Sequence, residues 1–158
     1  MGIVRLTALI GMLALGLALG SIVLGHLILV PALQADTTLV DANLARALAE
    51  PLALRTAELA LAACVILTAV AQRWLRHGAG TTLALIATGI AGADRLGVLP
   101  RVHEAWGRVD LVAMRPQVRI EAAEQLSLVH EVTTASLVVI LIAIAGLASV
   151  PRSRPGKS

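Results

Sequence analysis

The chain has 158 residues, of which 58% are hydrophobic and only 15% are charged, and its formal net charge is +3. This composition excludes an ordinary soluble domain and predicts an integral membrane protein. No stripe of Lys and Arg is interleaved with aromatic residues, which argues against nucleic acid as a partner. The arginines lie mainly at the ends of apolar runs, where they serve as topology signals and contact the lipid bilayer.

Four apolar runs are each long enough to cross a bilayer, so we expect an all-α bundle of four transmembrane helices in a single domain. The first run is about twice as long as the core of a signal peptide and has no clear cleavage site after it, so we interpret it as a retained helix. Pro31 and Pro100 are expected to close the first and third spans. The predicted spans are about 6–30, 52–72, 79–99 and 124–150, within the domain 1–158.

Within the first span, Gly16 and Gly20 form a GxxxG pair, a spacing that lets two helices approach closely. In such a glycine-rich helix the motif also arises by chance, and we favour local packing over a defined dimer. A homo-oligomer or a larger membrane complex stays open as an alternative.

The connection between the third and fourth spans predicts a short amphipathic helix in the membrane interface. Its apolar residues recur at helical spacing from Val102 to Ala113, and its charged residues lie on the opposite face. An ordinary solvated connector is the alternative. The side chains expected to contact lipid are Trp106, Arg108 and Arg115.

The basic residues of the chain predict its orientation. Arg5, the connection between the second and third spans, and the C-terminal tail fall on one side of a four-helix hairpin, and that side carries almost no acids. By the positive-inside rule, we expect both termini in the cytoplasm. The Ala-rich, aromatic-poor composition fits a GC-rich bacterial genome, and hence a multi-pass protein of a bacterial inner membrane.

Ionisable residues inside the apolar runs are the main functional signal. A charged group at membrane depth costs about 2.5–3.5 kcal/mol on insertion scales, so such groups usually face one another or a wet cavity. At 1.5 Å per residue, one ionisable residue from each span falls roughly 7–11 Å below the same boundary. The candidate residues for binding an ion or solute are His26, Glu58, Asp94, His130 and Glu131, with Arg55 and Arg95 as supporting charges.

Several chemistries suit this polar layer. His26 and His130, with carboxylates nearby, offer nitrogen and oxygen ligands for a metal ion, or two axial ligands for haem. Buried His and carboxylate side chains also serve as proton or ion relays. The alternative is a network of paired charges, such as Arg55 with Glu58, that fixes helix register.

Catalytic motifs are absent from the sequence. Ser127 and His130 are one turn apart, but the neighbouring Glu131 points about 100° away and cannot orient the imidazole as a triad requires. No phosphate-binding loop is present. We therefore do not expect an enzyme.

The order of motifs resembles the small four-helix membrane proteins grouped as domain of unknown function 4149, which include transmembrane protein 205. The matching segments are Val-Pro-Ala-Leu at 30–33, Asp-Ala-Asn-Leu-Ala-Arg-Ala-Leu at 41–48, Leu-Pro-Arg-Val at 99–102, and Leu-Ser-Leu-Val-His at 126–130. The resemblance implies a four-helix integral membrane protein without an established reaction; some members are associated with handling of platinum drugs or metals. Only His130 matches a motif position closely. The chain departs from the family in having no Phe and in its His-Glu pair.

The sequence therefore predicts a small membrane protein whose polar layer binds or relays an ion or small solute. A structural or assembly subunit of a membrane complex is one alternative. A membrane redox protein that binds haem or a metal is the other.

Overall fold

The computed structural model describes residues 2–35, 42–75, 78–109 and 117–149. These segments are almost entirely helical and contain no strand. The elements in chain order are α1 (Ile3–Ile22), η1 (Val23–Leu29), α2 (Val30–Ala35), α3 (Ala42–Leu75), α4 (Gly78–Ala93), η2 (Asp94–Val98), α5 (Leu99–Gly107) and α6 (Gln117–Ser149), where η denotes a π-helical stretch.

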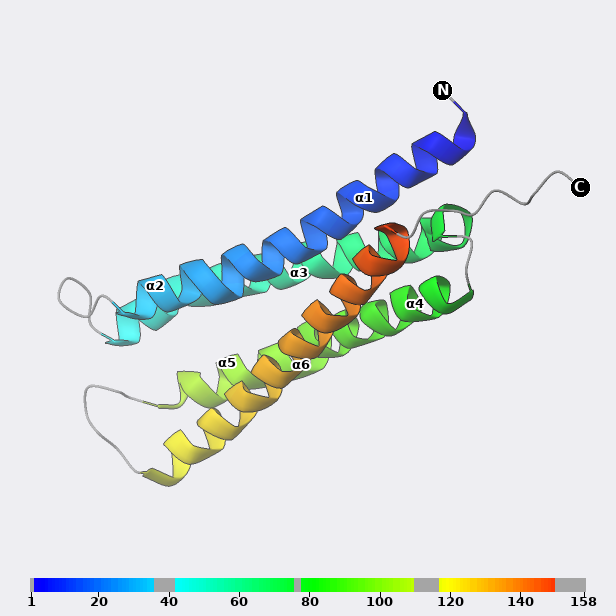
Figure 1. The fold of residues 1–158 in the computed structure, drawn as a ribbon. Helices are drawn as coiled ribbons and strands as arrows, with labels where there is room; N and C mark the ends of the chain where they lie inside the picture. The colour runs from blue at the N-terminus through cyan, green and yellow to red at the C-terminus, as the bar shows by residue number, and fades with distance from the viewer. Residues whose placement is uncertain (1, 36–41, 76–77, 110–116, 150–158) are drawn as a thin grey trace, which may run out of the picture.

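The elements join into four long helices that lie side by side (Figure 1). The first is α1–η1–α2, the second is α3, the third is α4–η2–α5, and the fourth is α6. Each is a helix of 30 residues or more that includes an apolar stretch long enough to cross a membrane. At 1.5 Å per residue a 30-residue helix is about 45 Å long, which exceeds the ~30 Å hydrocarbon core of a bilayer. The prediction of a multi-pass, four-helix membrane bundle is confirmed.

The helix boundaries differ from those expected at the prolines. The first helix continues past Pro31 to Ala35, and the third continues past Pro100 to Gly107. A proline removes one backbone donor and crowds the carbonyl four residues earlier. In both helices a wider π-helical turn, η1 or η2, precedes the proline, and the crowded carbonyl lies within it. The wider turn accommodates the proline, so the helix goes on.

The second helix also begins earlier than expected, at Ala42, with Pro51 inside it. The amphipathic segment predicted between the third and fourth spans is helical as α5, which follows η2 without a break. The part of that segment beyond Val109 lies outside the described residues.

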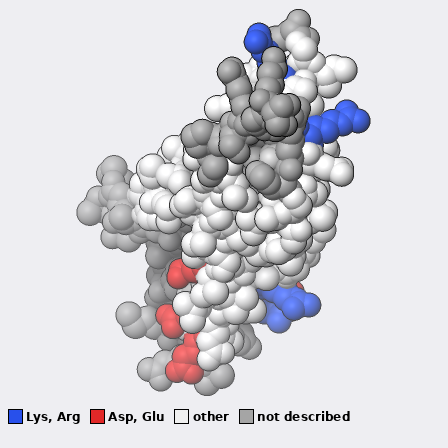
Figure 2. Space-filling view, turned by 45° about the vertical axis from the view of Figure 1, so that its right-hand side comes forward, with Lys and Arg blue, Asp and Glu red and all other residues white. Residues whose placement is uncertain are grey.

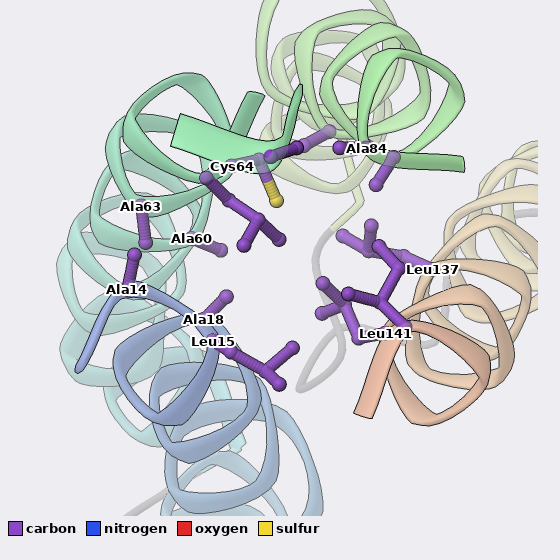
Figure 3. Close-up of a cluster of buried hydrophobic side chains, with 14 of the residues drawn as sticks. Ala14, Leu15, Ala18, Ala60, Ala63, Cys64, Ala84, Leu137 and Leu141 are labelled. Carbon is purple, nitrogen blue, oxygen red and sulfur yellow. The ribbon is translucent and has the colours of Figure 1, made fainter. Parts of the chain in front are cut away.

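Small side chains hold α1 against α3. Ala14 points toward Ala63, and Ala18 lies beside Ala60, at the crossing of the two helices (Figure 3). Small residues let transmembrane helices approach closely, which maximises van der Waals contact. Larger side chains fill the centre of the bundle, among them the fully buried Leu67, Leu141 and Ile144.

Two glycines mark close approaches between helices. A Cβ atom on Gly11 would lie 2.3 Å from Trp74, and one on Gly25 would lie 2.5 Å from Thr56. By contrast, Gly16 and Gly20 are exposed and have open space beside them. The GxxxG pair therefore faces away from the bundle and does not serve packing within this chain.

Charge is distributed unevenly along the bundle. The start of α1 and the end of α6 lie at one end of the bundle, and α2 and α5 lie at the other (Figure 1). Among the described residues, every Asp and Glu lies in the half that ends in α2 and α5. Figure 2 shows acidic side chains gathered in one half of the face that it displays. We call this half the acidic half, and it contains the candidate site.

Candidate intramembrane site

Three of the predicted side chains meet between three helices in the acidic half. His130 of α6 lies with its Nδ1 atom 2.7 Å from Oδ1 of Asp94, the first residue of η2. Its other nitrogen, Nε2, lies 3.4 Å from Nδ1 of His26, which is in η1. The two imidazole rings are edge to face, with centroids 4.9 Å apart. We refer to Asp94, His130 and His26 as the relay cluster.

The relay cluster is largely shielded from the surroundings. Only 13% of the His130 side chain and 10% of the Asp94 side chain are exposed. Buried polar groups are costly unless they are hydrogen-bonded, and charged ones more so. The contact with Asp94 satisfies one nitrogen of His130, and the contact with His26 satisfies the other.

The contacts are compatible with one consistent set of hydrogen positions. An ionised carboxylate only accepts hydrogen bonds, so with Asp94 ionised, Nδ1 of His130 is the donor of their contact. In a neutral His130 the Nε2 atom is then an acceptor, and it faces Nδ1 of His26 as the donor. The three groups thus form one continuous chain of donors and acceptors.

Both π-helical stretches carry a member of the relay cluster. His26 lies in the middle of η1 and Asp94 opens η2. π-Helical turns are frequent at functional sites, because the extra residue in the turn changes the direction of the side chains. Gly25 lets η1 approach Thr56 of α3, where any side chain would collide. The local sequences before Pro31 and Pro100 therefore place the polar side chains inside the bundle.

A small cavity adjoins the relay cluster. Its volume of about 10 Å³ suits one water molecule. His26, Asp94 and Thr134 supply its polar lining. The rest of its wall is apolar and consists of Ile22, Ala57, Ala60, Ala91 and Leu137.

Glu58 belongs to a separate ion-pair network. Its Oε1 atom lies 2.6 Å from Nη2 of Arg95, and its Oε2 atom lies 2.8 Å from Nη1 of Arg55. The pair with Arg95 connects α3 to η2, whereas Arg55 and Glu58 lie one turn apart on α3 itself. Glu58 is 39% exposed and Arg55 78% exposed, which agrees with a role in orienting helices near the bilayer surface.

Glu131 is not brought into the relay cluster. It lies next to His130 on α6, but its side chain is exposed on the outside of the bundle. Adjacent helical residues point about 100° apart, so only one of the two can face the interior.

The residues expected at the lipid interface take different roles. Nε1 of Trp106 donates to Oγ of Ser127, 2.8 Å away, and the guanidinium of Arg46 lies 3.7 Å from the centre of the ring. Trp106 therefore contacts both α3 and α6, and its side chain is half-buried. Arg108 is exposed and pairs with Glu104. Arg115 lies outside the described residues.

Two polar residues at this end of the bundle, Arg46 and the largely buried His103, were not among the candidates from the sequence. Nδ1 of His103 lies 3.3 Å from Oε1 of Glu50, a contact that connects α5 to α3. Both pairs were hidden because Arg46 and Glu50 precede Pro51, where the second span was expected to begin. Continuing the helical pattern back through Pro51 would have placed both residues on the second helix, opposite the helix expected from Val102 to Ala113.

The geometry of the relay cluster limits how it could bind haem or a metal ion. Haem requires a porphyrin plane between its two axial imidazoles, and no plane fits between rings in hydrogen-bond contact. Among the described residues, no group of three or more His, Cys, Asp or Glu side chains could hold a metal ion. His26 and His130 therefore offer at most two nitrogen ligands to a bare ion.

Comparison with known proteins adds no assignment. No family model matches the chain, and no curated protein or solved structure is similar to it. The resemblance to the domain of unknown function 4149 therefore stays a prediction.

Proposed function

We propose that this protein relays protons within the membrane through Asp94, His130 and His26. The observation that carries the proposal is the unbroken chain of hydrogen-bonding atoms from the Asp94 carboxylate to His26, across η2, α6 and η1. Imidazole can accept a proton on one nitrogen and release one from the other, which suits it to such a chain. Ionisable groups inside a membrane commonly mark proton relays.

The cavity beside His26 and Asp94 supports a path for protons beyond the three side chains. A water molecule there would reach both residues and Thr134. Toward the other end of the bundle, Leu67, Leu141 and Ile144 fill the interior. The apolar interior on that side interrupts the chain of polar groups, so proton transfer across the whole membrane would be slow and would require the helices to move.

In this proposal the protein resides in a bacterial inner membrane with both termini in the cytoplasm. Arg5 and Arg73, the described basic residues of the other half, would then lie near the cytoplasmic surface. The acidic half, with the relay cluster, would face outward.

The test is proton flux into vesicles that contain the purified protein and a pH-sensitive dye, driven by a potassium gradient and valinomycin. We expect flux above that of protein-free vesicles. His130→Ala and Asp94→Ala reduce it to the protein-free level, because each interrupts the chain. His103→Ala is the matched control, since His103 pairs with Glu50 outside the relay cluster. Flux that is unchanged in His130→Ala overturns the proposal.

An assembly subunit is the second candidate, favoured by the outward-facing Gly16 and Gly20. Exposed GxxxG pairs are typical of transmembrane helix association. Under this proposal, Gly16→Leu and Gly20→Leu in α1 disrupt an oligomer or complex in mild detergent. Gly89→Leu, at an exposed glycine in α4, is the control and does not. An unchanged molecular mass in both α1 variants contradicts it.

A further inference from the structure

The two imidazoles of the relay cluster have a spacing that also suits a metal ion. Nε2 of His130 and Nδ1 of His26 lie 3.4 Å apart and face each other. Zinc binds imidazole nitrogen at about 2.0–2.1 Å, and two such ligands in a tetrahedral arrangement lie about 3.3 Å apart. We propose that His26 and His130 form a two-imidazole site for a divalent transition-metal ion such as Zn²⁺, which competes with the shared proton.

Asp94 adds the feature that usually accompanies a metal-binding histidine. Its Oδ1 atom accepts a hydrogen bond from Nδ1 of His130, the nitrogen opposite the one that faces His26. Such a carboxylate fixes the tautomer and the orientation of the ring and increases its basicity as a ligand. The same contact therefore prepares His130 Nε2 for a proton or for a metal ion.

The cavity on the His26 side of the pair has room for one further ligand. It adjoins His26, Asp94 and Thr134, and it has space for about one water molecule. With two protein nitrogens and water, the site has fewer protein ligands than a structural zinc site. We therefore expect reversible binding, as in a transported or inhibitory ion, and not a permanently held cofactor.

Binding requires a change in protonation. The hydrogen bond between the rings uses one hydrogen, whereas a metal ion needs a bare nitrogen on each ring. Metal binding thus moves the hydrogen of His26 Nδ1 to its other nitrogen or to solvent. Occupation of both nitrogens removes the link between His130 and His26, so bound Zn²⁺ blocks the relay.

The test is calorimetric titration of Zn²⁺ into protein purified in mild detergent without chelators and with a tag that lacks histidine. We expect one ion per chain. His26→Ala and His130→Ala lower the affinity at least tenfold, and Asp94→Asn lowers it about 10–100-fold through the lost carboxylate. His103→Ala is the control and binds as the parent does. Absence of binding by the parent overturns the inference, and so does an affinity in His26→Ala and His130→Ala that equals that of the parent.

A second measurement needs no variant in the site and so does not depend on its folding. In parent protein labelled with ¹⁵N-histidine, Zn²⁺ is expected to shift the signals of His26 and His130 and to leave that of His103 in place. Shifts confined to other histidines contradict the proposed site. The inference stands apart from the relay: flux without zinc binding overturns the metal site alone, and zinc binding without flux overturns the relay alone.

Discussion

The contact of 2.7 Å between His130 Nδ1 and Asp94 Oδ1 connects α6 to the first residue of η2. It joins two helices inside a bundle whose centre is built mainly from Ala, Leu and Ile. In such surroundings an unpaired polar group costs much more than a hydrogen bond gains. The contact therefore fixes the position of η2 relative to α6 as well as the tautomer of His130.

Replacement of Asp94 tests how much this contact stabilises the bundle. Asp94→Ala leaves the buried Nδ1–H of His130 without an acceptor, and we expect a loss of about 1–3 kcal/mol in the free energy of unfolding. Asp94→Asn retains an amide oxygen at the same place, so its loss is smaller. Unfolding in mixed detergent, followed by circular dichroism, measures both. Equal stability of Asp94→Ala and the parent would show that the hydrogen bond is not made.

Gly25 tests the close approach of η1 to α3. A Cβ atom there would lie 2.5 Å from Cγ2 of Thr56, so Gly25→Ala forces the helices apart and is expected to cost about 1–3 kcal/mol. Gly89→Ala is the matched control, because Gly89 has open space beside it. An alanine at that position stabilises an exposed helix by up to about 1 kcal/mol. The two substitutions should therefore shift the unfolding midpoint in opposite directions, and a shared direction contradicts the packing described for η1.

Trp106 tests the contacts between α3, α5 and α6 in the acidic half. Trp106→Phe keeps an aromatic ring for the Arg46 guanidinium but removes the donor to Ser127 Oγ, with an expected loss of about 1 kcal/mol. Trp106→Leu also removes the ring that Arg46 covers, so its loss is larger. Thermal unfolding distinguishes the two variants. If Trp106→Leu and Trp106→Phe destabilise the protein equally, the stacking of Arg46 on the ring contributes nothing measurable to stability.

The sequence predicted the helical bundle and part of the site on physical grounds. Long apolar runs have few alternatives in a bilayer, because only a helix or a closed barrel satisfies the backbone there. The matched depth of His26, Asp94 and His130 followed from counting residues along each run, and the structure places these three in contact. The pairing of Arg55 with Glu58 followed from their spacing of one helical turn and is confirmed.

Helix rotation and the π-helical stretches could not be predicted in the same way. Whether Glu58 and Glu131 face the interior depends on the rotation of α3 and α6 about their axes. A predominantly apolar helix has little amphipathic pattern from which that rotation could be predicted. The sequence identifies Arg95 only as a supporting charge, and the rotation of the helices makes Glu58 of α3 its partner. The turns of η1 and η2 alter the side-chain directions around Asp94 and His26, and a proline at 31 or 100 by itself predicts a helix end, not a π-helical turn before it.

The most direct test of the relay is a measurement of the hydrogen bond between His26 and His130 in lipid bilayers. In protein labelled with ¹⁵N-histidine, magnetisation transfer between ring nitrogens reports their distance and shows which atoms carry hydrogen. We predict strong transfer between His130 Nε2 and His26 Nδ1, which lie 3.4 Å apart, with hydrogen on His130 Nδ1. Absence of transfer between His26 and His130 would contradict a proton chain through these residues. Hydrogen on both His130 Nε2 and His26 Nδ1 would contradict it as well.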